Sequence, residues 1–587
     1  PADPDDLVGH VGNADPSGMP DALSRSAAAF EAWSRRGAGE RASYLERIAD
    51  LYEAHAEEFF ALAAREAGKT LPDAIAEVRE AVDFLRYYAV EARRLDRERP
   101  GSGRGIFICI SPWNFPLAIF TGQIAAALAA GNTVVAKPAE QTPLIAARAV
   151  RLMHEAGIPK DVLQFLPGGS AIGARLVSDP RIAGVCFTGS IATARIIDKA
   201  MAEHCAPDTV LVAETGGLNA MIADSTALPE QAVRDIVASA FQSAGQRCSA
   251  LRILYIQNDV KEHVLQMLFG AMSELRLGDP WDPATDVGPV IDEEAEQDIT
   301  SYCGRMARKG RQLFKLDVPA RGRFVAPTVL EVSGIEELER EIFGPVLHVA
   351  GFEAREIDAV VDTVNRSGYG LTFGLHTRVD SRVQQVVDRL AAGNLCVNRN
   401  QIGAVVGSQP FGGEGLSGTG PKAGGPYTLV RLQRYPGADW NDTGPIGDAS
   451  VIPIADVQAA FDGLQVPNWR TRDDRAEVLH QALSSLDGDG PAQRALDEVA
   501  SIDTGPMDLP GPTGESNRLS FHPRGATLCL GPSVGMALVQ GVQALALGNA
   551  AVLAAPGVDA VIEPLMGIDA PVAALNGVLD PADLTSL

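Results

Sequence analysis

The sequence predicts an α/β protein organised around parallel β-sheets, and two observations support this fold class. Short runs of β-branched and aliphatic residues, such as residues 106–110 and 133–135, alternate with Ala-rich segments of helical periodicity. Strands that alternate with helices form parallel sheets through right-handed crossovers. The chain has 587 residues and 59 glycines, so it is long enough for several domains and suited to many tight turns.

The chain changes character along its length, and each change predicts a part of the fold. Apolar residues recur every three or four positions from about residue 21 to residue 96, which predicts helices. Strands alternating with helices are expected from Arg104 to about Arg247, and a second α/β region is expected to begin at Cys248. The strand candidates of that second region are residues 252–256, 346–350, 371–376 and 395–398. The predicted domains are residues 1–247 and 248–435.

The C-terminal part of the chain resembles a shortened copy of the first third. A segment rich in Gly, Pro, Asp and Asn predicts a linker over residues 436–457. The segments that carry the resemblance are residues 104–112 with 524–532, and residues 126–135 with 543–552. The copy has Ala555 where the first has Lys137, and it ends before any nucleophile. Residues 458–587 are therefore predicted to keep an α/β fold without its chemistry.

Composition excludes several classes of protein. A formal charge of -25 argues against a nucleic-acid partner, because phosphate binding needs clustered Lys and Arg. Seven dispersed cysteines, with no CxxC pair, predict no metal site and no disulfide framework, as in a cytoplasmic protein. Residues 105–136 and 525–558 carry no charge, but Pro, Gly and Asn interrupt them, so we expect buried strands and helices there and no transmembrane segment.

Seven short motifs occur in order between residues 112 and 413. They are Pro112-Trp-Asn-Phe-Pro, Lys137-Pro-Ala-Glu, Phe187-Thr-Gly-Ser, Glu214-Thr-Gly-Gly, Gly245-Gln-Arg-Cys, Glu341-Ile-Phe-Gly-Pro and Pro410-Phe-Gly-Gly. Together they resemble the aldehyde dehydrogenase superfamily. The resemblance implies a Rossmann-like NAD-binding domain over residues 1–247 and an α/β catalytic domain over residues 248–435, which holds a substrate anchor loop and an oligomerisation segment. It also implies an additional Rossmann-like domain at the C-terminus.

Aldehyde oxidation needs a nucleophile, oxyanion donors and a base, and the resemblance assigns each role. Cys248 matches the family's nucleophile, because a low-pKa thiolate forms an adduct that can expel hydride. Asn114 matches the amide that stabilises the oxyanion together with the N–H of Cys248. Glu214 matches the general base that hydrolyses the thioester. Taken singly, these residues also have plain structural interpretations: a packed thiol, a turn asparagine and a surface carboxylate.

The resemblance implies that the first domain binds NAD, although the sequence has no GxGxxG fingerprint. Lys137 and Glu140 match the pair that holds the adenosine ribose hydroxyls, and a carboxylate there disfavours the 2′-phosphate of NADP. Gly189 and Ser190 match residues that bind the pyrophosphate, and Gly169 and Gly173 match residues that let the neighbouring helix pack closely. Trp113, Glu341 and Phe343 match residues at the nicotinamide end of the cofactor.

Two further features point to the substrate. Ser249 follows the nucleophile, and a Gly-rich segment occupies residues 417–426. This pairing resembles the glutamate γ-semialdehyde (pyrroline-5-carboxylate) dehydrogenases, in which a serine hydroxyl and backbone N–H groups hold the α-carboxylate and amino group. Carried over, the anchors are Ser249, Gly424 and Gly425. An ordinary loop is the alternative interpretation, and another small semialdehyde such as succinate semialdehyde is the alternative substrate.

Nearly the whole chain resembles the C-terminal half of the bifunctional proline utilization A family, whose long forms end in a degenerate aldehyde-dehydrogenase-like domain. The resemblance implies that a proline dehydrogenase domain precedes Pro1 in the natural full-length chain and that the protein forms a homo-oligomer. A non-enzymatic scaffold is the rival interpretation. The presence of Cys248, Glu214 and Asn114 argues against it for the first 435 residues.

Overall fold

The chain forms two compact units, Pro1–Pro436 and Gly437–Leu587. The computed structural model describes residues 1–435, 450–464, 466–486, 490–531 and 533–580. Residues 436–449 of the predicted linker, 436–457, lie outside the described residues. Helix α15 (Ile454–Gly463) begins before the predicted end of the linker. Among the described residues, no helix is long and apolar enough to cross a membrane.

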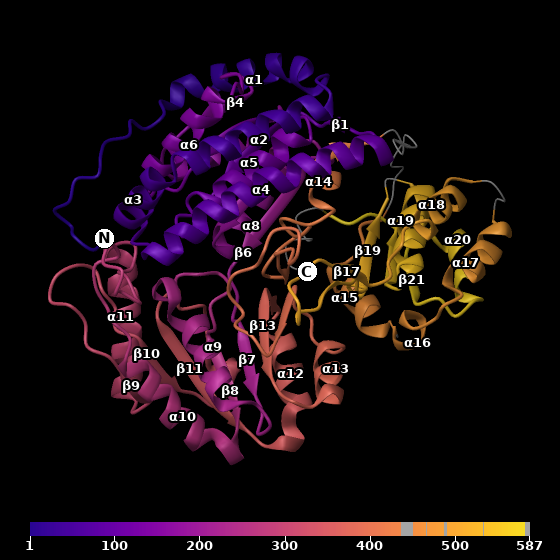
Figure 1. Cartoon of the computed structure of the whole chain (residues 1–587). Coiled ribbons are helices and arrows are strands. Elements are labelled where there is room, and N and C mark those ends of the chain that lie inside the picture. Colours follow the sequence, from indigo (N-terminus) through magenta and orange to yellow (C-terminus); the bar gives the residue numbers. More distant parts are fainter. Residues whose placement is uncertain (436–449, 465, 487–489, 532, 581–587) are drawn as a thin grey trace. The chain divides into compact units, whose positions relative to one another are not determined.

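The first unit opens with the predicted helical region (Figure 1). Its helices are α1 (Met19–Ser34), α2 (Ala38–Ala54), α3 (Ala56–Ala67) and α4 (Leu71–Glu98). Proline occupies the first turn of α1 and of α4, where the missing N–H costs no hydrogen bond. Helix α3 ends at Gly68, whose left-handed φ of 67° suits glycine. The apolar faces of α2 and α4 pack with α5 in one core that includes Tyr52, Phe59 and Tyr88.

A five-stranded parallel sheet follows, with strand order β4-β3-β2-β5-β6. Its strands are β2 (Ile106–Ile110), β3 (Thr133–Lys137), β4 (Leu163–Phe165), β5 (Ile182–Gly189) and β6 (Val210–Thr215). Its helices are α5 (Ala118–Ala129), α6 (Pro143–Glu155), α7 (Ser170–Val177) and α8 (Ile191–His204). Alternate residues of β2 belong to different hydrophobic cores. Phe107 and Cys109 pack in the core formed with α4 and α5, whereas Ile106 and Ile108 pack in the core formed with α7 and α8. The uncharged stretch 105–136 is thus a strand, a helix and a strand.

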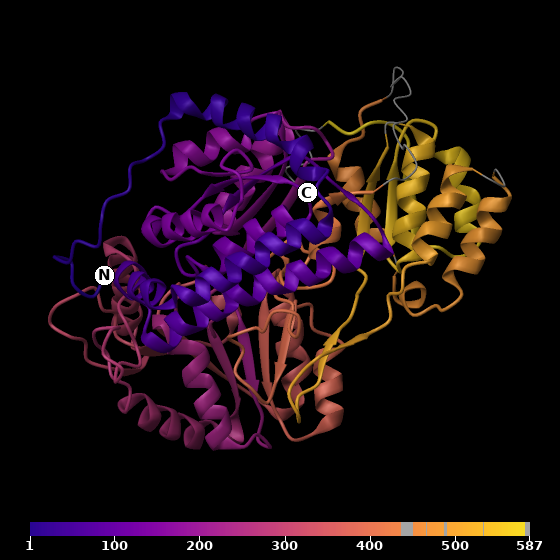
Figure 2. The ribbon, with the colours of Figure 1, turned by 45° about the horizontal axis from the view of Figure 1, so that its top comes forward.

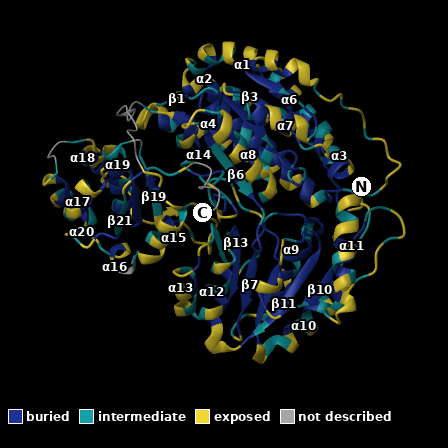
Figure 3. Cartoon of the chain, turned by 180° about the vertical axis from the view of Figure 1, so that it is seen from behind, coloured by how far each residue is buried: buried dark blue, intermediate teal, exposed yellow. Residues whose placement is uncertain are grey.

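The second sheet has seven strands in the order β14-β13-β7-β8-β11-β10-β9, and all but β9 pair in parallel. Figure 2 shows the strands of this sheet in magenta and salmon. The strands are β7 (Ala220–Ala223), β8 (Ile253–Gln257), β9 (Gln312–Lys315), β10 (Thr328–Glu331), β11 (Val346–Phe352), β13 (Thr372–His376) and β14 (Asn394–Val397). The helices are α9 (Pro229–Phe241), α10 (Asn258–Ser273), α11 (Glu293–Arg308), α12 (Ile357–Arg366) and α13 (Asp380–Val387). The central strands are buried, and the outer faces of the helices are exposed (Figure 3).

The chain passes from the first sheet to the second between Thr215 and Ala220, upstream of the predicted boundary at Cys248. The reason is physical: β7 follows β6 after four residues without a crossover helix, so it pairs with strands of a different sheet. Short elements join distant parts of this unit. Strand β1 (Ser102–Gly103), which precedes β2, pairs with β16 (Gln433–Arg434), and β12 (Tyr369–Gly370) pairs with β15 (Glu414–Gly415). Helix α14 (Thr428–Arg431) lies just before β16.

The second unit contains a three-stranded parallel sheet, β19 (Ala526–Leu530), β20 (Ala550–Ala554) and β21 (Val572–Leu575), in that order. Its helices after α15 are α16 (Pro467–Arg470), α17 (Arg475–Ser484), α18 (Pro491–Ala500), α19 (Val534–Ala546) and α20 (Asp559–Met566). A separate hairpin joins β17 (Met507–Leu509) to β18 (Asn517–Leu519). The segment that repeats the uncharged stretch of the first unit therefore also forms a strand, a helix and a strand.

Candidate functional site

Cys248 follows a tight turn that begins in the 3-10 helix η2 (Gln242–Gly245). Residues 243–245 have left-handed φ angles of 55°, 54° and 65°. A Cβ on Gly245 would lie 2.2 Å from the carbonyl oxygen of Gly344, so this position requires glycine. On the other side of the turn, the buried amide of Asn219 donates a hydrogen bond of 2.6 Å to the carbonyl of Cys248. The backbone that carries the thiol is held from both directions.

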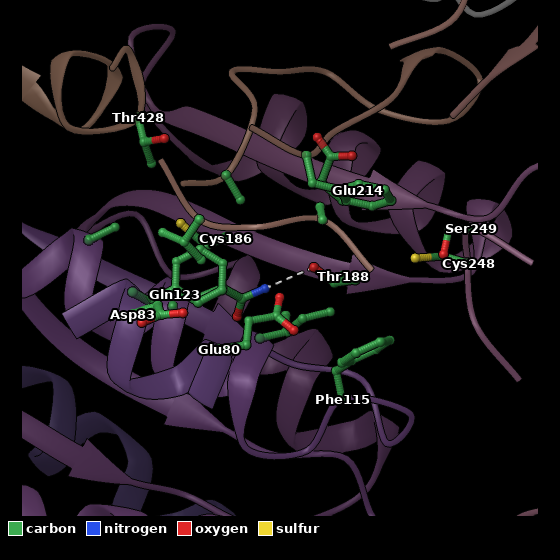
Figure 4. Close-up of a pocket in the computed structure, with 18 of the residues that line it drawn as sticks. Glu80, Asp83, Phe115, Gln123, Cys186, Thr188, Glu214, Cys248, Ser249 and Thr428 are labelled. Atoms are coloured by element: carbon green, nitrogen blue, oxygen red, sulfur yellow. Dashed lines mark hydrogen bonds between the residues drawn. The ribbon is translucent and has the colours of Figure 1, made fainter. Parts of the chain in front are cut away.

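A cavity of about 410 Å³ opens beside this turn. Cys248, Ser249 and Glu214 line it together with Phe115 and Glu80, and Figure 4 shows the sulfur of Cys248 turned into the cavity. These residues come from segments far apart in the sequence: the turn before β8, the end of β6, and helix α4. The structure thus brings together a thiol, a hydroxyl and two carboxylates around a cavity large enough for a small organic molecule.

Asn114 lies in the loop between β2 and α5 and faces the Cys248 turn. Its Nδ2 donates a hydrogen bond of 3.2 Å to the carbonyl of Gln246, two residues before Cys248. An amide nitrogen carries two N–H groups, so this bond uses one of them. The side chain is buried, and its neighbourhood suits an amide that donates to an oxygen formed beside the thiol.

Glu214 projects from the carboxyl-terminal part of β6. Its Oε2 accepts a 2.8 Å hydrogen bond from the N–H of Gly413, whereas Oε1 is buried and has no hydrogen-bond partner among the described residues. A Cβ on Gly412 or Gly418 would come within 2.9 Å or 2.8 Å of the carboxylate, so a side chain at either position would displace it. Burial raises the pKa of Glu214 to about 8, and Gly413 and Lys422 offset this only in part. The group can therefore gain or lose a proton near neutral pH.

Electrostatics around Cys248 differ from the sequence-based expectation of a low-pKa thiolate. Burial, followed by the charges of Glu341 and Glu214, raises the pKa of the Cys248 thiol to about 12. The N–H of Ser249 and the charge of Arg252 act in the opposite direction. Burial by segments that are distant in the sequence therefore opposes the low-pKa thiolate that the sequence led us to expect.

Three of the predicted cofactor residues meet next to the Cys248 turn. The rings of Trp113 and Phe343 stand edge to face with centroids 5.5 Å apart. Glu341 accepts hydrogen bonds of 3.1 Å and 2.8 Å from Nε and Nη2 of Arg252. A Cβ on Gly216 would lie 1.8 Å from Oε2 of Glu341, so the carboxylate packs directly on the glycines that follow β6.

Lys137 and Glu140, with Gly169 and Gly173, form a second cluster at the carboxyl ends of β3 and β4. Lys137 is buried and its Nζ donates to the carbonyl of Pro138, 3.1 Å away. A Cβ on Gly169 would lie 3.3 Å from Oε1 of Glu140, and one on Gly173 would lie 3.6 Å from Cδ of Lys137. Burial lowers the pKa of Lys137, and the charge of Glu140 raises it. The glycines therefore leave room for helix α7 against the two charged side chains.

Gly189 and Ser190 lie where β5 ends and α8 begins. Ser190 is the N-cap of α8, and its Oγ accepts a 3.2 Å hydrogen bond from the N–H of Thr193. Its side chain is exposed, so the first turn of the helix faces solvent. The N-terminus of a helix carries a partial positive charge and unpaired N–H groups, which suits a phosphate.

The three predicted substrate anchors differ in position. Ser249 lines the cavity, as does Ala423 of the Gly-rich segment. The N–H of Gly424 donates a 2.9 Å hydrogen bond to the hydroxyl of Tyr88, because its φ of 66° turns the peptide toward helix α4. A Cβ on Gly425 would lie 2.9 Å from Cβ of Pro410, so this glycine allows two segments of the loop to pack closely.

The structure adds cavity residues that sequence reasoning missed. Glu80, Asp83 and Arg79 of helix α4 line the cavity, and buried Asp73 pairs with Arg247 at 2.8 Å. Burial, then the charge of Glu77, raises the pKa of Glu80 to about 8. The sequence signal was an acidic stripe at helical spacing, Asp73, Glu77, Glu80 and Asp83, which is usually a solvated face.

Sequence comparisons place the chain among known proteins. The profile described as "Aldehyde dehydrogenase family" matches residues 1–435. "Bifunctional protein PutA" of Klebsiella aerogenes is 48% identical over 564 residues, which are 93% of this chain and 42% of that protein. "1-pyrroline-5-carboxylate dehydrogenase" of Geobacillus kaustophilus is 38% identical over 455 residues, which are 74% of this chain and 88% of that protein. The chain thus spans less than half the length of its PutA relative.

Solved structures agree with these relatives. A PutA structure from Bradyrhizobium japonicum, mutant D779W, matches with a TM-score of 0.71 and 51% identity over 72% of this chain and 45% of that chain. A 1-pyrroline-5-carboxylate dehydrogenase from Thermus, solved with bound NAD, matches with a TM-score of 0.70 and 34% identity over 74% of this chain and 87% of that chain.

Proposed function

The chain belongs to the aldehyde dehydrogenase family, and we propose that it oxidises L-glutamate γ-semialdehyde to L-glutamate with NAD, the second step of proline catabolism. The relatives named 1-pyrroline-5-carboxylate dehydrogenase and PutA support this reaction. The observation that carries the proposal is the cavity that Cys248, Glu214 and Ser249 line together. A thiol nucleophile, a base and a polar anchor are the groups that thioester-forming oxidation of a small polar aldehyde requires.

The first half of the reaction uses Cys248 and Asn114. The sulfur attacks the aldehyde carbon, its proton passes to water in the cavity, and the carbonyl oxygen becomes an oxyanion beside the amide of Asn114 and the N–H of Cys248. Since the pKa of Cys248 is raised to about 12, the thiol is protonated at neutral pH and must lose its proton as it attacks. The chemistry that bound NAD would supply is the acceptance of the hydride from the former aldehyde carbon. Cys248 would then carry the substrate as a thioester.

The second half uses Glu214. Water adds to the thioester carbon, Glu214 takes the proton of that water, and the carbon–sulfur bond breaks to release a carboxylate and the thiol of Cys248. A carboxylate with a pKa of about 8 is an effective base near neutral pH. Oε2 is held by Gly413, so Oε1 is the oxygen that serves this step.

The residues of two clusters, one around Lys137 and one beside the Cys248 turn, fit a dinucleotide. Lys137 and Glu140 would hold the adenosine ribose, and the exposed first turn at Ser190 would receive the pyrophosphate. Glu341 would hold the nicotinamide ribose, with the rings of Trp113 and Phe343 on one side and the thiol on the other. The side chains of Lys137 and Glu140 are close enough to interact electrostatically, as expected of a pair that binds vicinal hydroxyls together. Glu140 would repel a 2′-phosphate, so NAD is proposed rather than NADP.

The substrate carries a carboxylate and an ammonium group at the end remote from the aldehyde. We propose that Ser249 and the N–H of Gly425 hold the carboxylate, since the N–H of Gly424 is already donated to Tyr88, and that Glu80 faces the ammonium. Glu80 supports this role because it lines the same cavity and its pKa is raised, which an adjacent cation would reverse. Succinate semialdehyde has no ammonium group and would leave Glu80 without a partner.

We also propose that the second unit is a degenerate copy of the cofactor domain, and equivalent hydrogen bonds support it. The indole N–H of Trp33 donates to the carbonyl of Leu128, and that of Trp469 donates to Leu545. Nε of Arg41 donates to Ala129, and Nε of Arg475 to Ala546. Asn132 accepts from the N–H of Gly105, and Asn549 from that of Gly525. Ala555 stands where the first unit has Lys137, so the copy would keep the fold and lack the cofactor site.

The proposal extends to assembly and location. The chain covers 42% of its PutA relative, so we propose that a proline dehydrogenase domain accompanies it in the natural full-length chain. We propose a cytoplasmic location, because seven dispersed cysteines without a CxxC pair suit a reducing compartment. We propose a homo-oligomer formed through the catalytic domain.

Steady-state kinetics with two aldehydes test the proposed substrate. With NAD, kcat/KM for glutamate γ-semialdehyde should exceed that for succinate semialdehyde by at least about tenfold, roughly 1.4 kcal/mol of transition-state binding. The Glu80→Gln variant should lose most of this preference while keeping its activity on an uncharged aliphatic aldehyde. Equal kcat/KM values in the wild type would refute the substrate and leave the family assignment in place.

A further inference from the structure

Arg252 is a buried guanidinium whose donors are all used. A guanidinium has five N–H groups. Nε and Nη2 donate to Oε1 of Glu341 at 3.1 Å and 2.8 Å, and Nη2 also donates to the carbonyl of Arg247 at 2.9 Å. Nη1 donates to the carbonyls of Gly245 and Gly344 at 2.8 Å and 3.2 Å. Only 1% of the side chain is exposed.

The acceptors belong to two segments about one hundred residues apart in the sequence. Gly245 and Arg247 form the turn that presents Cys248, and Glu341 and Gly344 form the loop that carries Phe343. Arg252 itself is fixed at the start of β8, where its carbonyl accepts hydrogen bonds from N and Nδ1 of His348 at 2.9 Å and 2.8 Å. Burial lowers the pKa of His348 to about 4, so the ring is neutral and Nδ1 can donate at physiological pH.

We infer that Arg252 is a positioning residue that ties the Cys248 turn to the Glu341 loop, so that whatever binds Glu341 controls the reactivity of the thiol. The inference rests on the proposed function, in which Glu341 binds the nicotinamide ribose. The five bonds make Arg252 the bridge between that carboxylate and the backbone on the amino-terminal side of Cys248. A lysine has one nitrogen and three donors, so it retains the charge but cannot make these five bonds.

Charge adds a second route from Arg252 to the thiol. The charged groups that act on Cys248 are Glu341 and Glu214, which raise its pKa, and Arg252, which lowers it. Arg252 also lowers the pKa of Glu341, which burial raises. Removal of Arg252 alone would leave the carboxylate of Glu341 uncompensated beside the sulfur. Removal of both charged groups would cancel most of that change.

The test is the pH dependence of iodoacetamide alkylation at Cys248 without cofactor, followed by mass spectrometry of the Cys248 peptide. In Arg252→Met the rate near pH 8 should fall about tenfold, which corresponds to a thiol pKa about one unit higher. In Glu341→Gln the rate should rise, and in the double variant it should return to within about threefold of wild type. Arg252→Lys should stay near wild type in alkylation, yet lose at least about tenfold in kcat with NAD.

A matched control removes another ion pair of the catalytic part of the chain. Arg382 of helix α13, whose side chain is 23% exposed, pairs with buried Asp224 at 2.7 Å, and Arg382→Met should leave the Cys248 pH profile unchanged. A double variant that alkylates as slowly as Arg252→Met alone, or a profile of Arg252→Met like that of Arg382→Met, would overturn the inference. If Arg252→Met does not fold, wild-type kcat in Arg252→Lys overturns it. Failure of the proposed function is distinct, because then Glu341→Gln leaves the KM for NAD unchanged while the double variant still regains the wild-type alkylation rate.

Discussion

The backbone N–H of Gly413 donates a hydrogen bond of 2.8 Å to Oε2 of Glu214. The bond joins the end of β6 to the segment that returns from the second sheet, and an isolated bridge between Glu214 and Gly418 runs beside it. One carboxylate oxygen is thereby fixed by protein, and the other has no partner in the described part of the chain. This asymmetry orients the carboxylate and leaves one oxygen for water.

The first prediction concerns the Glu214→Gln variant. The amide can still accept from Gly413 but cannot take a proton from water, so thioester hydrolysis should slow more than hydride transfer. Stopped-flow measurement should show a rapid burst of NADH followed by a steady state at least about 100-fold slower than wild type. If burst and steady state decline together, Glu214 supports the fold or positions the cofactor instead.

The second prediction concerns pH. Glu214 acts as a base only when ionised, and its pKa of about 8 replaces the usual 4.5, so hydrolysis should rise with pH through about 8. The raised pKa also means that the folded protein binds more protons than the unfolded chain, so this group lowers stability as pH rises from 4.5 to about 8. The melting temperature of Glu214→Gln should therefore exceed that of wild type by more at pH 9 than at pH 4. A constant difference between the two proteins contradicts the raised pKa.

Most strands of the first sheet could be predicted from the sequence, because parallel strands buried on both faces are short apolar runs. Residues 106–110 are the clearest case, since the expected strand coincides with β2. The passage between the sheets could not be located, because β7 is only four residues long and follows β6 without a helix. The chain was divided by the alternation of strands and helices, and this pattern does not mark the passage between the sheets.

The positions of site residues in the sequence could be predicted, but several of their interactions could not. Cys248 and Glu214 are marked by local motifs. The pKa of Cys248 depends on burial by segments distant in the sequence, and the N–H of Gly424 is directed to Tyr88 by a left-handed φ that sequence spacing does not specify. Glu80 was missed because an acid at helical spacing is more often solvent-exposed than cavity-lining.

The third prediction separates substrate binding from chemistry. Ser249→Ala should raise the KM for glutamate γ-semialdehyde about tenfold and leave an aliphatic aldehyde nearly unaffected, since a hydrogen bond to a charged group contributes roughly 1.5–3 kcal/mol. Thr188→Val is the matched control: Thr188 also lines the cavity and accepts a 3.1 Å hydrogen bond from Gln123. It should affect both aldehydes alike. An equal effect of Ser249→Ala on both aldehydes removes its role as an anchor.

The fourth prediction concerns the second unit. A degenerate copy without the lysine should bind no dinucleotide, so calorimetric titration of the whole chain should give one NAD per chain. Lys137→Ala should weaken that single site by about tenfold or more, since it removes a charged hydrogen-bond donor. Ala555→Gly should leave affinity and stoichiometry unchanged. A second binding event that persists in Lys137→Ala would show that the second unit retains a working site.

The most direct test of the account is the covalent state of Cys248 during turnover. Glu214→Gln is mixed with NAD and glutamate γ-semialdehyde, quenched in acid, digested and examined by mass spectrometry. The Cys248 peptide should carry one glutamyl group in thioester linkage, in an amount that matches the NADH burst, and Cys248→Ala should produce neither adduct nor burst. NADH formed by Cys248→Ala at a rate within about tenfold of wild type, a barrier change of roughly 1.4 kcal/mol, would contradict the central claim.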